Sequence, residues 1–157
     1  MLPKEPIETT LKDLQRLYDH HSDSNHKIYF SKLALLELCG WIELAQDEII
    51  KSYSSTKLTK QSNKDEIEKL VLKTYGFSYK NHFRQMIIQL IGFTKTEILE
   101  DNLTGDILIL KTQLGALSGL RNPSAHTPIS GTISTYQSPS TMLIGSRDTW
   151  ETQALQP

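Results

Sequence analysis

Hydrophobic positions in the first 120 residues recur at the spacing of amphipathic helices. The pattern predicts helices at about 10–21, 26–53, 64–75, 78–91 and 104–120, with a short helical turn at 94–100. Thr9 or Thr10 is expected to cap the first helix and Ser78 the fourth. The segment at 26–53 carries apolar residues on more than one face, which predicts burial between several neighbours. Ser52 to Asn63 is polar and has no hydrophobic period, so we interpret it as a loop.

The composition changes after residue 126 to Ser, Thr, Pro and Gly with few charges. The pattern therefore predicts an all-α domain over residues 1–126, an up-and-down bundle of four to five helices, followed by a Ser/Thr/Pro-rich extension or tail over residues 127–157. Within the tail, Thr132 to Tyr136 has mild strand propensity. Met142 to Ile144 and Trp150 are candidates to dock on the bundle or on a partner.

Length and charge narrow the class of protein. A chain of 157 residues suits one domain, and a net charge of −1 argues against a general polyanion binder. The single cysteine, Cys39, excludes an internal disulfide and cannot build a metal cluster alone. No apolar run reaches transmembrane length and the N-terminus lacks the apolar region of a signal peptide, so we expect a cytoplasmic protein without membrane contact.

The charge is unevenly distributed along the chain. Residues 51–84 hold eight basic and three acidic side chains, a local balance of +5, interleaved with Tyr75, Phe77 and Tyr79. Such a segment is able to guide a phosphate backbone, although charge runs are more often the solvated face of a helix. Both interpretations stay open from the sequence.

The stretch Leu117 to Pro128 holds the residues best suited to chemistry. Arg121 is charged at any working pH, His126 can exchange a proton near pH 7, and Asn122 supplies a polar amide. On an unbroken helix the Arg and His would lie about 140° apart around the axis and about 7.5 Å along it. Pro123 predicts either a kinked helix that carries the whole motif, or a helix that ends near Arg121 with Asn122 as the N-cap of a new turn.

The segment from Arg121 to His126, at the end of an apolar helix in a small helical protein, resembles the Arg-x4-His motif of the HEPN superfamily. These are α-helical domains, and many are metal-independent endoribonucleases. Asn122 matches the polar residue that usually follows the Arg, and Pro123 departs from the pattern. The helix from Tyr29 to Ile50 also resembles a central helix of some prokaryotic members.

The resemblance implies a function and a site. It implies a homodimer in which the two motifs face each other, RNA cleavage through the ribose 2′-hydroxyl, and no cofactor or metal. His126 would act as general base or acid, Arg121 would stabilise charge on the phosphate, and Asn122 would hold His126 or the phosphate. It further implies a role as a toxin or in phage defence, in some members beside a nucleotidyltransferase-type antitoxin.

The competing interpretation is a non-catalytic helical module that dimerises or binds a nucleotide or a partner protein. Under it, Arg121 and His126 satisfy helix-end carbonyls or contact a phosphate without cleaving it. The small residues Gly115, Ala116 and Gly119 predict that helix 104–120 packs closely against another helix, inside the subunit or across a dimer.

Two other groups of side chains have alternative interpretations. His20, His21 and His26 lack the cysteine and spaced carboxylate partners of zinc or iron sites, so we interpret them as surface histidines. Glu43 and Asp47 are four residues apart and share a helix face. That face either meets solvent or supplies a carboxylate that hydrogen-bonds Arg121 or His126.

Overall fold

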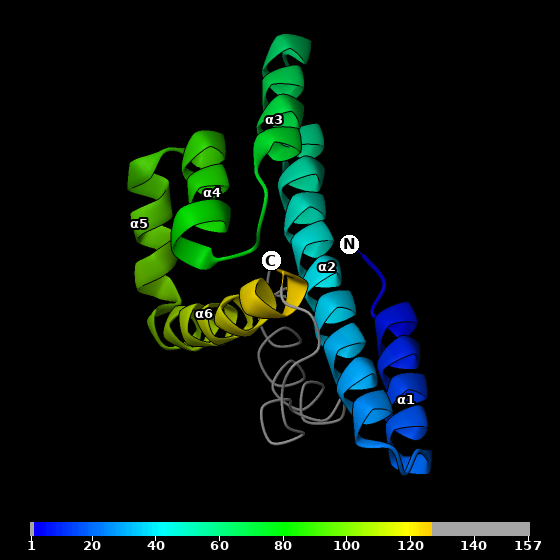
Figure 1. Ribbon diagram of the computed structural model, residues 1–157. Helices are drawn as coiled ribbons and strands as arrows, with labels where there is room; N and C mark the ends of the chain where they lie inside the picture. The colour runs from blue at the N-terminus through cyan, green and yellow to red at the C-terminus, as the bar shows by residue number, and fades with distance from the viewer. Residues whose placement is uncertain (1, 127–157) are drawn as a thin grey trace. The chain divides into compact units, whose positions relative to one another are not determined.

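The computed structural model describes residues 2–126, which form α-helices, one π-helical segment and no strand (Figure 1). The all-α fold is therefore confirmed for this part of the chain. The elements are α1 Glu5–His20, α2 Ser24–Lys57, α3 Gln61–Lys73, η1 Tyr79–Phe83, α4 Arg84–Ile91, α5 Phe93–Asn102 and α6 Thr104–His126. The interpretations of Thr132 to Tyr136, Met142 to Ile144 and Trp150 lie outside the described residues.

The helix boundaries differ from the sequence pattern mainly at the N-terminus and after α2. Helix α1 begins at Glu5, before the expected cap at Thr9 or Thr10. Pro6 at the first turn fixes a helical φ, and the acidic Glu5 and Glu8 there complement the positive end of the helix dipole. These local signals outweigh the lack of apolar periodicity in the first residues.

The loop expected from Ser52 to Asn63 is wrong over most of its length. Helix α2 continues to Lys57, and α3 already begins at Gln61. The hydroxyls of Ser55 and Thr56 donate to the carbonyl of Ser52 at 2.9 and 2.8 Å, so these polar side chains bond to their own helix. A polar helical segment of this kind has no hydrophobic period for the sequence pattern to detect.

The segment at 94–100 is a full helix, α5, of 10 residues rather than a short turn. It follows Gly92, whose φ of 82° ends α4 and turns the chain directly into α5. Only glycine adopts this backbone conformation without strain. The described residues therefore contain six α-helices, where the hydrophobic pattern predicts four to five.

The described chain divides into two compact units. The α1 unit comprises residues 3–41 and 116–126, and the α3–α5 unit comprises residues 42–115 together with residue 2. Helices α2 and α6 each contribute a segment to both units. The domain boundary at residue 126 stays a prediction, because the residues beyond it are not described.

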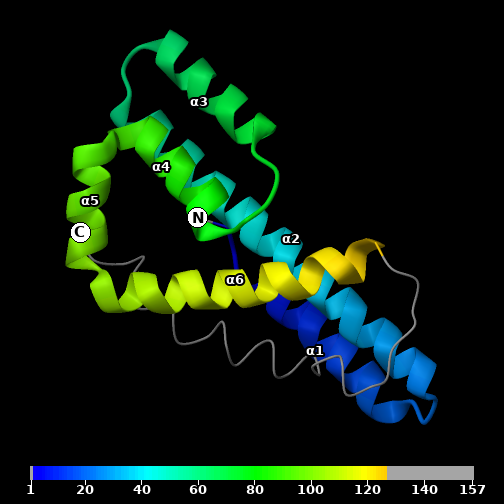
Figure 2. The ribbon, with the colours of Figure 1, turned by 60° about the vertical axis from the view of Figure 1, so that its left-hand side comes forward.

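In the α1 unit, α1 runs antiparallel beside the first half of α2 (Figures 1 and 2). The indole Nε1 of Trp41 donates to the Pro3 carbonyl at 3.2 Å, and the ammonium of Lys27 lies 5.2 Å from the centroid of the Tyr18 ring. These contacts fasten the two ends of the α1 segment to the first half of α2. The buried apolar residues of α1 and the first half of α2 include Ile7, Leu11, Leu14, Ile28, Ala34, Leu35 and Leu38.

In the α3–α5 unit, the turn after α3 is attached to α2. The Glu43 carboxylate accepts the Gly76 N–H at 2.6 Å, and the Gln46 side-chain amide donates to the Phe77 carbonyl at 3.0 Å. Gly76 has a φ of 115°, which explains why glycine stands there. The turn then leads into η1, and α4 follows directly after it.

Ser78 occupies the N-cap position of η1, but its side chain does not cap the helix. Its hydroxyl is instead hydrogen-bonded to Nδ1 of His82 at 2.8 Å. The backbone amides of His82 and Phe83 both donate to the Ser78 carbonyl, and the second of these bonds closes the wider π turn. Ser78 therefore occupies the expected N-cap position but does not make the side-chain hydrogen bond of a cap.

Candidate functional site

Helix α6 carries the whole motif, since it runs without interruption from Thr104 to His126 with Pro123 inside it. The alternative in which the helix ends near Arg121 and Asn122 caps a new turn is wrong. Pro123 has no N–H to donate to the carbonyl of Gly119, and its ring crowds that carbonyl. Gly119 has open space around it, because an added Cβ would meet nothing within 4 Å, so the backbone has room to adjust.

The Arg121 side chain is half-buried, Asn122 and Pro123 are exposed, and Ser124 is buried with 6% of its surface accessible. Among residues 2–126, no hydrogen bond or ion pair engages the Arg121 guanidinium. Within residues 2–126, Arg121 therefore satisfies no helix-end carbonyl. An unpaired guanidinium retains its donors for an incoming anion, and its fork suits a phosphate.

Arg121 and His126 occupy different faces of α6 by helical register. Five residues of continuous helix separate them by about 140° around the axis and about 7.5 Å along it. The side chain of His126 lies outside the described residues. Because the two positions face different directions, one helix brings both side chains to the same point on a ligand only if the long arginine side chain bends around the helix.

Glu43 and Asp47 were candidates to orient the motif, and both belong to the α3–α5 unit. The hydrogen bond of the Glu43 carboxylate goes to the Gly76 amide. Burial raises the pKa of Asp47, an effect that Lys51 opposes and Glu43 adds to. A supporting role of either carboxylate toward Arg121 or His126 stays a prediction.

The three N-terminal histidines are occupied by local contacts. His20 Nδ1 lies 2.7 Å from the Arg16 carbonyl, and His26 Nδ1 lies 2.9 Å from Asp23 Oδ2. The rings of His21 and His26 stack with centroids 4.9 Å apart. Nowhere in residues 2–126 do three or more His, Cys, Asp or Glu side chains gather as metal ligands would.

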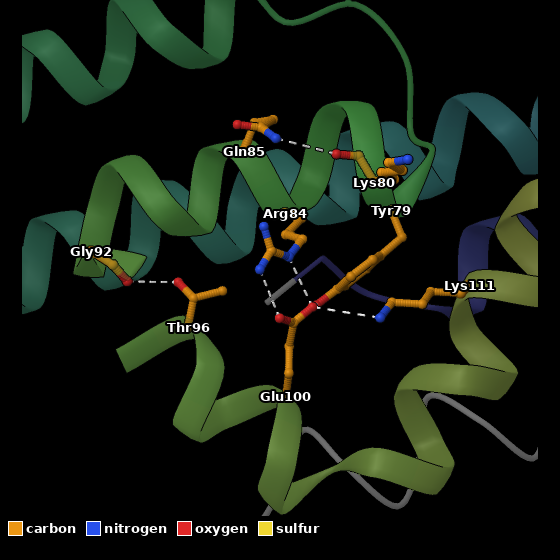
Figure 3. Close-up of polar contacts among 8 residues, drawn as sticks. All are labelled: Tyr79, Lys80, Arg84, Gln85, Gly92, Thr96, Glu100 and Lys111. Carbon is orange, nitrogen blue, oxygen red and sulfur yellow. Dashed lines mark hydrogen bonds and ion pairs between the residues drawn. The ribbon is translucent and has the colours of Figure 1, made fainter. Parts of the chain in front are cut away.

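The strongest polar cluster of the described chain is one that the sequence analysis missed (Figure 3). Arg84 on α4 donates from Nε and a terminal nitrogen to the two Glu100 carboxylate oxygens, each at 2.9 Å. The Tyr79 hydroxyl donates to the same carboxylate at 2.8 Å, and Lys111 Nζ lies 3.6 Å from it. Lys111 also lies 4.9 Å from the centroid of the Tyr79 ring.

This cluster shifts two pKa values in opposite senses. The hydrogen bonds from Arg84 lower the pKa of Glu100 to about 2, although burial opposes them. Burial, and then the bond to Glu100, raises the pKa of Tyr79. Every donor in the cluster points at one carboxylate, so the arrangement joins η1, α4, α5 and α6 and does not hold a free reactive group. Most of the contacting pairs are separated by 16 or more positions in the chain. No local sequence pattern predicts contacts between residues so far apart.

The small-residue face of α6 is open within the described chain. Gly115, Ala116 and Gly119 are exposed, and a Cβ added at either glycine would meet nothing within 4 Å. The prediction that this face packs closely against another helix is therefore wrong for the described part of the subunit. Its packing across a dimer stays a prediction.

Comparison of the chain with protein-family models, with curated proteins and with solved structures found no match. None of the helices in residues 2–126 combines the length and apolarity that crossing a membrane requires.

Proposed function

We propose that this chain is a metal-independent endoribonuclease of the HEPN type that works as a homodimer. The observation that carries the proposal is the guanidinium of Arg121, which has no hydrogen bond or ion pair to any described residue and stands beside the exposed Asn122 on the last turns of a continuous helix. His126 ends that helix. A guanidinium, an amide and an imidazole are the groups that phosphodiester cleavage needs.

In the proposed reaction the ribose 2′-oxygen attacks the adjacent phosphorus and the bond to the 5′-oxygen breaks. His126 removes the 2′-proton or supplies a proton to the departing 5′-oxygen. Arg121 neutralises charge that develops on the phosphate, and Asn122 holds the imidazole or the phosphate. The products carry a 2′,3′-cyclic phosphate and a 5′-hydroxyl. DNA, which lacks the 2′-hydroxyl, is not a substrate.

Two features of α6 support a dimer. Arg121 and His126 differ in register by about 140°, so a site shared between two chains combines the two groups more easily than one helix does. The face that contains Gly115 and Gly119 is open, and Leu108 is 66% exposed nearby on the same helix. Small residues let a second helix approach closely, and a two-fold axis would bring the two motifs together.

The cellular setting is part of the same proposal. A cytoplasmic toxin or phage-defence effector that cleaves RNA fits the resemblance in the motif, with an antitoxin of nucleotidyltransferase type as one partner. Expression of the intact chain should then arrest growth. His126→Ala should relieve the arrest at equal protein level.

The decisive experiment incubates the protein with structured and unstructured RNA in excess EDTA. Cleavage should persist, and end analysis should find cyclic phosphate and 5′-hydroxyl termini. Arg121→Ala should lower the rate on the order of 100-fold or more, the size expected for a lost charge contact in the transition state. Arg121→Lys should restore little, because an ammonium cannot form the forked contact.

Arg16→Ala is a matched control. Arg16 is an exposed arginine paired with Asp13 on α1, so its removal deletes the same charge outside the motif. It should leave the rate unchanged. Cleavage that requires added metal, or that survives His126→Ala at full rate, would remove the catalytic assignment.

The second candidate is a non-catalytic module that dimerises or binds a nucleotide or partner protein. The register difference between Arg121 and His126 favours it, because within one chain only Arg121 need contact a phosphate. This module would retain RNA in a filter-binding assay in EDTA without shortening it. Arg121→Ala would then weaken retention, and His126→Ala would leave it unchanged.

A further inference from the structure

A groove of about 520 Å³ lies in the α3–α5 unit, between α3, the end of α2 and α4. Its volume falls within the range of small-molecule sites in proteins. All the residues that line it belong to this one unit. It shares no residue with the motif on α6.

The lining separates into an apolar floor and a polar rim. The four aliphatic residues are buried or half-buried, whereas the polar residues are all exposed. The floor consists of Leu58, Ile67, Leu70 and Leu90. The rim consists of Asn63, Glu66, Lys69, Lys73 and Gln89.

The rim has a net positive charge, because it contains two lysines and one glutamate. Lys69 donates to the Glu66 carboxylate at 2.8 Å, so these two charges offset each other. Lys73 forms no hydrogen bond or ion pair within the described residues. The surrounding segment, residues 57–73, holds five lysines against three acidic residues, which adds a positive field around the groove.

From this arrangement we propose that the groove binds a small anionic amphiphile, with an aliphatic or aromatic body on the floor and a carboxylate or phosphate head at Lys73. An apolar body covers the surface that Leu58, Leu70 and Leu90 still expose to water, which a purely ionic ligand does not do. The head gains a cation whose ammonium forms no hydrogen bond or ion pair with another described residue. A cationic amphiphile would meet Lys73 as a like charge.

The test uses dodecyl phosphate, titrated calorimetrically into the full chain below its micelle-forming concentration. Binding should be measurable and should weaken as salt is added. Dodecyltrimethylammonium, with the same tail, should bind at least 10-fold more weakly. Inorganic phosphate alone should not bind detectably.

Variants locate the site. Lys73→Glu should weaken binding of dodecyl phosphate at least 10-fold. Lys80→Glu makes the same charge change at an exposed lysine of the same unit that does not line the groove, and it should change binding less than twofold. Leu70→Asn should weaken binding by altering the floor, with a circular dichroism spectrum that establishes whether the variant is folded.

Amide chemical shifts in the wild-type chain give an independent measurement that needs no variant. Dodecyl phosphate should move the resonances of Leu70, Lys73 and Gln89 more than those of the α1 unit. The proposal is overturned if both amphiphiles bind equally, if Lys73→Glu and Lys80→Glu act alike, or if the shifts centre elsewhere. Binding of oligouridylate at this face without binding of dodecyl phosphate would also overturn it and assign the lysines to nucleic acid.

Discussion

Arg84 and Glu100, separated by 16 positions in the chain, form a two-pronged ion pair with both nitrogen–oxygen distances at 2.9 Å. The pair joins α4 to α5 across the turn at Gly92. The Arg84 and Glu100 side chains are 25% and 16% exposed, so water only partly screens the two charges. Tyr79 donates to the same carboxylate and thereby attaches η1 to the pair.

Replacing Glu100 by Gln should therefore destabilise the protein. The variant loses the carboxylate charge and leaves the Arg84 guanidinium half-buried without its partner. We expect the free energy of unfolding to fall by about 1–2 kcal/mol, the size of charge-assisted hydrogen bonds at a partly exposed site. Urea denaturation measures it. Glu66→Gln, which breaks the exposed pair with Lys69, should change stability little; equal effects of the two variants would contradict the structural role of Glu100.

The same carboxylate should make stability depend on acid pH. Its pKa is about 2 in the folded protein against an ordinary value of 4.5. A lowered folded pKa means that the stabilisation is complete above about pH 4.5 and is lost as the pH falls toward 2. Asp47, whose pKa burial raises, contributes in the opposite sense, since its stabilisation is lost as pH rises.

Comparing the wild type with Glu100→Gln isolates the contribution of Glu100, because Asp47 titrates in both proteins. The difference in unfolding free energy between the two should shrink steadily between about pH 4.5 and pH 2. A difference that stays constant over this interval would show that Glu100 is not the group responsible.

Gly76→Ala should destabilise the turn between α3 and η1 for two separable reasons. The φ of 115° is strained for any residue with a Cβ, and the new Cβ would lie 2.8 Å from Cε1 of His82. We expect a loss of about 1–3 kcal/mol, the range for backbone strain of this kind. In a His82→Ala background the steric part disappears and the backbone part remains, so Gly76→Ala should cost less there. An unchanged cost would assign the whole effect to the backbone.

Mixing two inactive variants tests whether the proposed ribonuclease site is shared between chains. Arg121→Ala and His126→Ala homodimers should each be inactive. If a site takes Arg121 from one chain and His126 from the other, each mixed dimer keeps one intact site. Random exchange then restores about a quarter of wild-type activity, since half of the dimers are mixed and half of their sites are whole.

The control for the mixing experiment is the unmixed variants at the same total concentration, with light scattering to establish that dimers form and exchange. No restored cleavage in exchanging dimers would show that each site draws both residues from one chain. A monomer at micromolar concentration would count against the dimer itself.

The sequence by itself determined the helical class and most of the helix cores, because amphipathic periodicity is a local property of the chain. The apolar residues at Leu11, Leu14, Ile67 and Val71 all belong to such a period, and all are buried. The predicted helices at 64–75 and 78–91 leave out Gly76 and Gly92, the two residues at which the described backbone takes a positive φ. The motif from Arg121 to His126 was visible for the same reason, since its spacing lies within one helix.

Only the tertiary structure decided which helix ends persist and which distant side chains meet. The polar end of α2 stays helical where Ser54 is buried and the Ser55 carbonyl accepts from Lys64 of α3 at 3.0 Å, contacts that no hydrophobic pattern records. Pro123 permits two backbone paths, and the structure takes the continuous helix. The pair of Arg84 and Glu100 depends on the turn at Gly92 that brings α5 back to α4, so its contact exists only once the helices have packed. Local spacing carries no information about such a contact because the energy that selects it comes from long-range packing.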